Sequence, residues 1–356
     1  MFTLSCCFIV KDEEKVLERI LKVVEEFADE IVVVDTGSAD STVEIAKKYT
    51  DKVFYFPWQD DFSKARNFAF SKASCEYLMW LDADDFIFPK DVEKIKKLKS
   101  SEIDFDVAFF KYVTGYDAKY KPTFIFERER IVKNDGTFFW QEPVHEVIVP
   151  HGIALRLDIK IYHMKKERVR PKRNLEIYEK NLGNLSPRAT FYYARELYYN
   201  HFYDRAIAEF SKFLNMHGAW VENKIEACLN MSYCFLSLND TESALKILFQ
   251  SFVYDLPRAE ILCQIGNIYL NSDYQKAIYY FSLALKCKMN VNSGAFVLPD
   301  YYNFYPSIEL CVLYYRLGDY KKSYKFHKRT KRLKPNHPSV IHNEKLFNDL
   351  KSQNLI

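Results

Sequence analysis

The stretch YLMWLDAD, residues 77–84, is a run of large apolar residues that ends in two carboxylates. A short apolar run rich in aromatic residues is typical of a buried strand. An open α/β sheet binds its ligand outside the carboxyl ends of its strands, so the stretch predicts that Asp82 and Asp84 lie at a binding edge. Alone it is weak evidence, because D-x-D arises by chance in any acidic chain and also fits the first turn of a helix ahead of Pro89.

Around this stretch, from residue 3 to about residue 160, short β-branched or aromatic runs alternate with amphipathic segments, which indicates an α/β domain. Strands are expected at 3–10, 31–35, 53–56, 77–82 and, further on, at about 105–113, 123–132 and 154–162. Helices are expected at 13–27, 41–49 (capped by Ser41) and 61–73. The strand-rich later part predicts a mixed sheet.

The second half of the chain has a helical pattern. Small residues that would pack between paired helices, Ala206, Ala244, Ala277 and Ser323, recur at intervals near the ~34 residues of a tetratricopeptide unit. The last interval is longer, which places an insertion at Asn290–Pro306. We therefore expect a catalytic α/β domain at 1–167, a linking helix at 168–186 and an all-α repeat domain at 187–356. The repeats specify packing; a concave peptide-binding surface is a hypothesis.

Composition excludes several classes of protein. The chain has 51 basic and 48 acidic residues and a net charge of +3, so nucleic acid is not an expected partner. The basic tract at 321–332 is interpreted as a solvated helix face. The sequence has no apolar stretch of about 18 residues, so a transmembrane segment is not expected. The N-terminus lacks the basic start of a signal peptide. Eight cysteines without a C-x-x-C motif favour buried thiols in a reducing cytoplasm.

Acidic residues follow three of the expected strands, in Lys11-Asp12-Glu13, Asp35-Thr36-Gly37-Ser38 and Asp82-Ala83-Asp84. Clustered carboxylates repel one another unless positive charge lies between them. A divalent cation with a nucleoside diphosphate supplies that charge, and Mg²⁺ or Mn²⁺ prefers such oxygen ligands. A nicotinamide or P-loop enzyme is not favoured, because the chain has only nine glycines and no G-x-G.

The order of the motifs, DTGSADST from residue 35, WQDDFSKARN from residue 58 and WLDADD from residue 80, resembles the family-2 nucleotide-sugar glycosyltransferases of GT-A fold over about residues 2–165. Within that family the chain is similar to the lipopolysaccharide-core β-glucosyltransferase group and to sublancin-type peptide S-glycosyltransferases, which also carry a helical repeat tail. The resemblance implies a Rossmann-like mixed sheet and a cytoplasmic, bacterial, inverting, metal-dependent hexosyltransferase. Glucose from UDP-glucose is the first candidate for the transferred sugar, and a peptide side chain or a glycan for the acceptor.

The resemblance also implies roles for individual residues. Asp84 and His163 would be metal ligands. The nucleotide-sugar-binding set would comprise Val10, Glu13, Asp35, Arg66, Asp82, Ala83 and Arg173. Asp35 could instead cap the turn at Gly37, Arg66 could pair with Asp60 or Asp61, and His163 could be an ordinary partly buried imidazole. The basic cluster Arg168, Arg170, Lys172 and Arg173 could neutralise pyrophosphate or be a solvated helix turn. Asp12 stands where the family usually has Asn.

An inverting transfer needs a base that removes the proton of the acceptor. The segment WQEPVHE, residues 140–146, matches the family's V-H-E element. Glu146 is the expected base, with His145 orienting it or touching the acceptor, and Glu142 is the competing base.

Two classes of function remain open at this point. The first is the enzyme, with a UDP-sugar donor and an acceptor held by the helical repeats. The second is a non-catalytic helical-repeat scaffold with a vestigial nucleotide-sugar domain. The sequence does not decide the acceptor, the sugar or the oligomeric state, for which a homodimer is one alternative.

Overall fold

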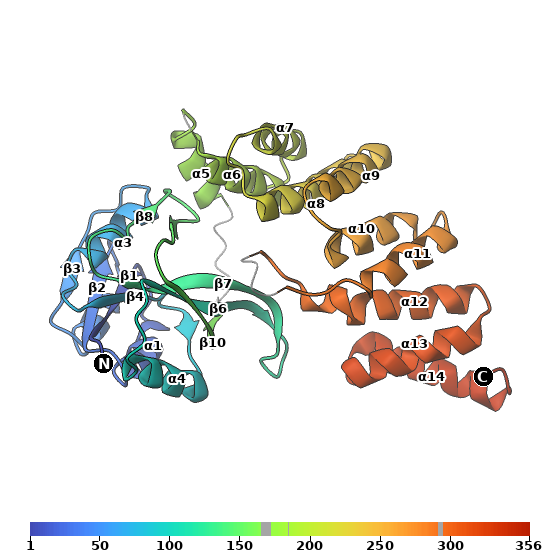
Figure 1. Ribbon diagram of the computed structural model, residues 1–356, viewed down its shortest axis with the longest axis horizontal. Helices are drawn as coiled ribbons and strands as arrows, with labels where there is room; N and C mark the ends of the chain where they lie inside the picture. Colours follow the sequence, from blue (N-terminus) through green and yellow to red (C-terminus); the bar gives the residue numbers. More distant parts are fainter. Residues whose placement is uncertain (165–171, 184, 291–294) are drawn as a thin grey trace. The chain divides into compact units, whose positions relative to one another are not determined.

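The computed structural model describes residues 1–164, 172–183, 185–290 and 295–356 and divides them into two compact units (Figure 1). The first unit consists essentially of Met1–Asn200, and the second of His201–Asn290 and Phe296–Ile356. The fold class expected from the sequence is confirmed, because a mixed α/β sheet is followed by a helical array.

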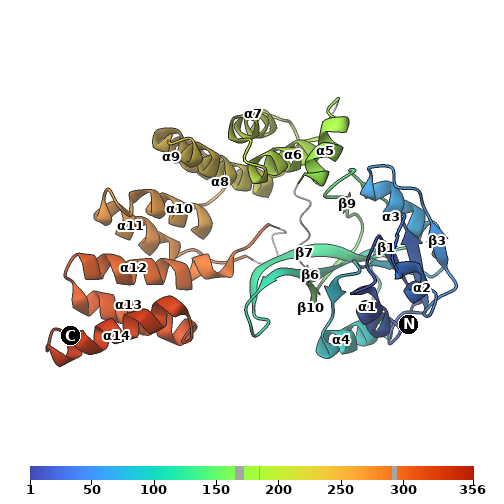
Figure 2. The same ribbon diagram turned by 180° about the vertical axis from the view of Figure 1, so that it is seen from behind.

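An eight-stranded mixed sheet forms the centre of the first unit, with the strand order β3-β2-β1-β4-β7-β6-β10-β5. Figure 2 labels β1, β3, β6, β7 and β10 of this sheet. The first four strands in this order are parallel, β7 is antiparallel to both of its neighbours, β10 is parallel to β6, and β5 is antiparallel to β10. The strands are β1 (Leu4–Val10), β2 (Glu30–Asp35), β3 (Val53–Tyr55), β4 (Tyr77–Trp80), β5 (Asp85–Phe86), β6 (Val107–Tyr116), β7 (Pro122–Lys133) and β10 (Ala154–His163). Two short strands, β8 (Trp140–Gln141) and β9 (Val147–Ile148), form a separate pair.

Strand register brings the carboxyl ends of several strands to one edge of the sheet. Val10 is paired with Asp35, and Cys7 with Trp80, so β1, β2 and β4 end side by side. Strand β10 runs in the same direction as β4, because β7 reverses the direction once and β6 restores it. Its last residue, His163, therefore lies at the same edge as the end of β4.

Both faces of the central strands are buried, as is usual for parallel sheets. Leu4, Cys6, Phe8 and Val10 alternate onto one face and pack with residues of α1 and α4. Cys7, on the opposite face, belongs to a second cluster with residues of α3. The helices of this unit are α1 (Leu17–Val24), α2 (Thr42–Ala46), α3 (Phe62–Phe70), α4 (Pro89–Lys99), α5 (Arg173–Lys180) and α6 (Pro187–Tyr199).

The expected cap of the second helix is wrong in one detail. Ser41 occupies the N-cap position of α2, but its side chain makes no capping hydrogen bond. The carboxylate of the preceding residue, Asp40, accepts from the backbone N–H of Thr42 at 3.0 Å.

The second unit contains α7 (Tyr203–Leu214), α8 (Val221–Ser237), α9 (Thr241–Gln250), α10 (Ala259–Tyr269), α11 (Tyr274–Ala284), α12 (Phe304–Arg316), α13 (Tyr320–Leu333) and α14 (Pro338–Ser352), with short 3₁₀ turns at Ser251–Val253 and Pro299–Tyr302. The small residues that indicated repeats, Ala206, Ala244, Ala277 and Ser323, are fully buried. Gly266 faces Phe281 so closely that a Cβ there would be 3.0 Å from the ring. The packing of paired helices is thus as predicted.

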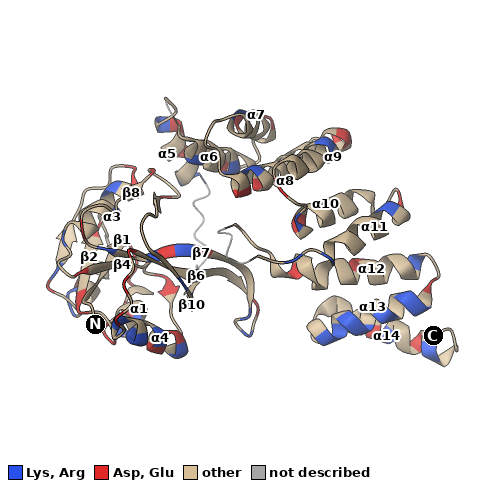
Figure 3. Cartoon of the chain, in the orientation of Figure 1, with Lys and Arg blue, Asp and Glu red and all other residues tan. Residues whose placement is uncertain are grey.

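Other expectations from composition can also be compared with the structure. Lysine and arginine positions are frequent along α13 (Figure 3). Most of these residues are exposed, as expected of a solvated face. All eight cysteines are free thiols, and six of them are buried. Among the helices of the described residues, none has the length and apolarity needed to cross a membrane.

Candidate functional site

Three carboxylates and one imidazole meet at the carboxyl edge of the sheet. The ligand atoms of Asp82, Asp84, Asp85 and His163 all lie within 4.8 Å of one another. His163 ends β10 and is paired with Asp85 of β5, while its Nδ1 is 3.2 Å from Oδ1 of Asp84. The two residues predicted to be metal ligands, Asp84 and His163, thus lie together with the carboxylates of Asp82 and Asp85.

Asp85 is bonded to buried groups that no sequence motif indicated. Arg130 donates from Nη1 to Oδ2 of Asp85 at 3.1 Å, and both side chains are fully buried. The hydroxyl of Tyr112 donates to Oδ1 of Asp85 at 3.1 Å and lies 2.9 Å from Nδ1 of His163. The guanidinium of Arg130 lies between two rings, 3.6 Å from the centroid of Trp80 and 4.3 Å from that of Tyr112. Asp85 is therefore fully buried and bonded to buried groups, whereas the side chain of Asp84 is 24% exposed.

Charge around the cluster shifts two pKa values. Burial lowers the pKa of His163, but hydrogen bonds and charge from Asp84 and Asp85 outweigh it and raise that pKa to about 10. Burial raises the pKa of Asp82, but the charges of Arg66, His163 and Arg130 outweigh it and hold that pKa well below its usual range. The carboxylate of Asp82 therefore stays ionised beside positive charge.

Arg66, on α3, links the cluster to the residue predicted to be the base. Its Nη2 donates to Oδ1 of Asp82 at 2.7 Å, and its Nε donates to Oε1 of Glu146 at 2.6 Å. The guanidinium lies 4.9 Å from the ring centroid of Trp80 and 4.8 Å from that of Trp140. Burial lowers the pKa of Arg66, but the carboxylates of Asp82 and Glu146 raise it by a larger amount. The side chain therefore remains a cation.

The alternative partners of Arg66 are engaged elsewhere. Asp60 accepts from Lys180 at 2.5 Å, and Asp61 caps α3 by accepting from the backbone N–H of Lys64 at 3.1 Å. The alternative that Arg66 pairs with Asp60 or Asp61 is therefore wrong.

The three candidate residues of the 142–146 segment have different surroundings. The side chain of Glu146 is 13% exposed and is held by Arg66. Glu142 accepts from the hydroxyl of Ser186. Nε2 of His145 is 2.8 Å from Oε1 of Glu196, and its ring stacks on Tyr192 at 4.3 Å. The side chain of His145 is thus engaged with α6 and makes no direct hydrogen bond to the carboxylate of Glu146 among those found in the described residues.

The expected nucleotide-binding residues of β1 and β2 lie beside one another. Val10 is paired with Asp35, whose carboxylate accepts from the backbone N–H groups of Gly37 and Ser38 at 3.1 Å. This is the turn cap that was the alternative role for Asp35. Asp12 has a φ of 54°, and its carboxylate accepts from the N–H of Ala39 at 2.8 Å. Glu13 donates from its N–H to Oγ1 of Thr42 at 2.7 Å.

The remaining expected residues are Ala83 and the basic cluster. Ala83 is buried between the two aspartates of the motif. Arg173 begins α5, and its guanidinium lies 4.8 Å from the ring centroid of Phe62, one helical turn before Arg66 on α3. Arg168 and Arg170 lie outside the described residues.

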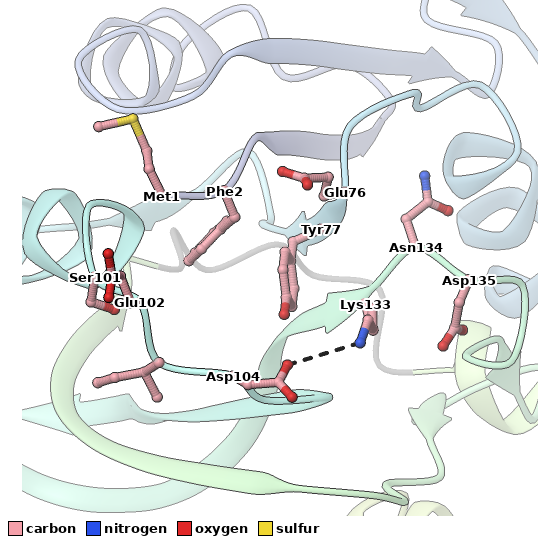
Figure 4. A pocket seen from close by; sticks show the side chains of 11 residues that line it. Met1, Phe2, Glu76, Tyr77, Ser101, Glu102, Asp104, Lys133, Asn134 and Asp135 are labelled. Atoms are coloured by element: carbon pink, nitrogen blue, oxygen red, sulfur yellow. Dashed lines mark ion pairs between the residues drawn. The ribbon is translucent and has the colours of Figure 1, made fainter.

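A pocket at the opposite edge of the sheet does not contain these residues (Figure 4). It is lined by residues around the starts of β1 and β4, including Phe2 and Tyr77, and by Asp104 and Lys133, whose charged atoms are 3.9 Å apart. The carboxylate cluster and Glu146 are therefore a separate feature of the fold.

The first unit is similar to known proteins. Residues 5–160 match the model of Glycosyl transferase family 2. A TPR repeat-containing protein of Synechococcus elongatus is 33% identical over 156 residues, which cover 44% of this chain and 38% of that protein. The SPbeta prophage-derived glycosyltransferase SunS of Bacillus subtilis is 27% identical over 254 residues, covering 67% of this chain and 60% of SunS. The lipopolysaccharide core biosynthesis glycosyltransferase LpsC of Rhizobium meliloti is 30% identical over 160 residues, covering 42% of this chain and 58% of LpsC. The chain thus spans between 38% and 60% of the length of these relatives.

Proposed function

We propose that the chain, whose residues 5–160 match the model of Glycosyl transferase family 2, moves a hexose from a nucleoside diphosphate sugar to a peptide side chain or a glycan. UDP-glucose is the first candidate donor. The proposal rests on the two ion pairs of Arg66, one with Asp82 of the carboxylate cluster and one with Glu146. These ion pairs link the proposed donor site to the proposed base.

The donor atoms at the cluster fit a divalent cation. Carboxylate oxygens suit Mg²⁺ and Mn²⁺, and an added imidazole is compatible with Mn²⁺. Asp84 and His163, whose side chains are 24% and 22% exposed, would hold the ion, whereas Asp85 is fully buried against Arg130. A bound cation supplies positive charge that stabilises the diphosphate as it leaves.

Glu146 is the group that we assign to proton removal. Arg66 donates a hydrogen bond to Oε1 of Glu146 and so fixes the position of the group that would accept the proton. The acceptor's proton moves to Glu146, and the acceptor atom forms a bond to the anomeric carbon of the sugar. The bond from that carbon to the diphosphate oxygen breaks on the opposite face, and its electron pair leaves with the diphosphate.

The nucleotide end of the donor is assigned to the ends of β1 and β2. Val10, Glu13 and Asp35 would line the base and pyrophosphate, with Asp82 and Ala83 at the ribose and Arg173 at the phosphates. The Asp35 carboxylate already accepts two backbone N–H bonds, so its contribution to a nucleobase would be added to a role in the turn. The helical repeats are the proposed holder of the acceptor.

The scaffold alternative is not favoured. A decayed domain would have no need to keep the buried Arg130–Asp85 pair beneath Asp84 and the Arg66 bridge to Glu146. Buried ion pairs contribute little net stability compared with apolar packing, so they are weak evidence of a purely structural role.

Incubation of the chain with a panel of nucleotide sugars and Mn²⁺ tests the proposal, with products followed by mass spectrometry. We expect slow release of UDP from one UDP-hexose, and faster release when acceptor peptides or glycans are added. Glu146→Gln is the matched control that should bind the donor without turning it over. Absence of UDP release from every sugar, with or without lysate acceptors, would contradict the enzymatic function.

A further inference from the structure

The segment that carries Glu146 has an unusual backbone. Glu142 and His145 have φ angles of 73° and 53°, in the left-handed region. Residues with a side chain adopt this region at a cost, and they keep it where the surrounding structure determines the conformation. The contacts of the segment therefore show what holds it.

Two arginines hold the carbonyl groups at the end of this segment. Arg188, on α6, donates to the backbone oxygen of His145 from Nη2 at 3.1 Å and from Nε at 3.3 Å. Arg128, on β7, donates from Nη2 to the backbone oxygen of Glu146 at 3.1 Å. Charged donors make stronger hydrogen bonds than neutral ones. The peptide groups on both sides of the base are thus fixed by cations.

The carbonyl groups before them are held as well. The hydroxyl of Tyr178, on α5, donates to the oxygen of Val144 at 3.1 Å. The N–H of Phe62, the first residue of α3, donates to the oxygen of Pro143 at 2.8 Å. Four consecutive carbonyl groups are therefore fixed from four different elements.

Side chains of the segment are also bound by α6. His145 is 2.8 Å from Glu196 and stacks on Tyr192, both on α6. Glu196 is buried, and Asn174 of α5 donates to it at 3.1 Å. Ser186, the N-cap of α6, donates to Glu142. The same helix thus contacts both residues that have positive φ angles.

We infer that α6, together with Tyr178 of α5, is a positioning element that holds the 142–146 segment so that Glu146 faces Arg66. The inference rests on the proposed function, because Glu146 is the proposed base. The sequence pattern placed α6 in the repeat domain expected at 187–356, yet α6 belongs to the compact unit of the sheet. Helix α6, which the sequence pattern places at the start of the repeats, therefore holds the 142–146 segment that carries Glu146.

Arg188 is the residue to change, in the full-length protein. Small misplacements of catalytic groups lower turnover strongly, so Arg188→Ala should reduce kcat for UDP-sugar turnover about tenfold or more. The KM for the donor and the affinity for UDP should stay within about twofold, because the nucleotide contacts are elsewhere. Arg188→Lys keeps one charged donor and should recover part of kcat. Arg205→Ala, on the exposed surface of α7, is the matched control.

A second measurement does not depend on turnover. Hydrogen–deuterium exchange of peptides covering residues 142–148 should be faster in Arg188→Ala than in the wild type and in Arg205→Ala, while exchange in β1 and β4 stays unchanged. Tyr178→Phe, which removes only the hydroxyl, should act in the same direction with a smaller effect.

The outcomes separate the two proposals. Failure of the wild type to turn over any nucleotide sugar would refute the proposed function. Hydrogen–deuterium exchange at residues 142–148 would then be the one remaining test of whether α6 positions the segment. Unchanged exchange at 142–148 in Arg188→Ala would overturn the inference, as would a kcat equal to that of Arg205→Ala. A parallel fall of kcat, UDP affinity and thermal stability would also overturn it, because it would indicate general loss of structure.

Discussion

Arg66 donates to Glu146 at 2.6 Å although the two residues are 80 positions apart in the chain. The same guanidinium binds Asp82, so a single cation joins the end of β4 to the segment that carries the proposed base. This relationship gives α3 a role in the site beyond the proposed contact of Arg66 with a nucleotide.

Replacing Arg66 should affect both turnover and stability. Arg66→Ala leaves Asp82 and Glu146 without their cation in a largely buried place, which should cost about 3 kcal/mol of unfolding free energy. We expect kcat to fall at least ~100-fold, since proton removal is then misaligned. Chemical denaturation and steady-state kinetics measure the two effects. Lys64→Ala, on the same helix with a 57% exposed side chain, should change neither; equal effects of the two variants would argue against the bridge.

Glu146 and Glu142 can be distinguished by paired substitutions. Glu146→Gln should keep UDP affinity and lower kcat by about 100- to 10,000-fold, as expected for loss of a general base. Glu142→Gln should have a small effect, because Glu142 is bonded to Ser186. Kinetics with a saturating donor measures both. If Glu142→Gln abolished transfer while Glu146→Gln did not, Glu142 would be the base.

Arg130 should be essential for the fold around the cluster. Arg130→Leu removes the buried cation that pairs with the fully buried carboxylate of Asp85, and breaking a buried pair typically costs about 3–5 kcal/mol. Denaturant unfolding of the variant measures this cost. The double variant Arg130→Leu with Asp85→Asn should recover part of the stability, and no recovery would contradict the assigned pairing.

A carboxyl group in the helical unit predicts a pH dependence of stability. Burial raises the pKa of Glu260 to about 7, in spite of hydrogen bonds from the N–H of Leu298 and the hydroxyl of Tyr302. The folded state binds this proton more tightly than the unfolded state. The contribution to stability is therefore complete below the ordinary pKa near 4.5 and is lost as pH rises through about 7. It amounts to at most about 3 kcal/mol.

Glu260→Gln isolates this contribution. Unfolding free energies measured at pH 5 and pH 8 should differ less in the variant than in the wild type. Glu242→Gln, with an 80% exposed side chain, is the control and should leave the difference unchanged. An identical pH dependence in wild type and Glu260→Gln would contradict the role of this group.

The sequence predicts the parts of the site that follow strand ends. The apolar run before Asp82 identifies β4, and parallel strands then require that the ends of β1, β2 and β4 lie together. Asp85 follows the D-x-D motif directly, so the sequence indicates that it lies near the cluster. Its hydrogen bond to Arg130 could not be predicted from the sequence. Arg130 and Tyr112 lie within strands, where no local pattern distinguishes them from other strand residues. Their meeting depends on the register of β6 and β7.

The contacts of the 142–146 segment could not be predicted for a related reason. Positive φ angles are usually indicated by Gly or Asn, but Glu142 and His145 give no such signal. The bonds to Arg188 and Glu196 join the segment to a helix that the repeat pattern assigns to another domain. A truncation designed from the sequence at residue 187 would remove α6, so a test of acceptor binding by the repeats should begin the deletion at His201.

Calorimetric titration of UDP is the most direct test of the central claim, that Asp84 and His163 hold a divalent cation which binds the donor. We predict that UDP binds the wild-type chain in the presence of Mn²⁺ and that EDTA removes this binding. Asp84→Asn should weaken it at least tenfold while the protein remains folded, because one charged ligand is lost. Equal UDP affinity with Mn²⁺, with EDTA and in Asp84→Asn would contradict the account.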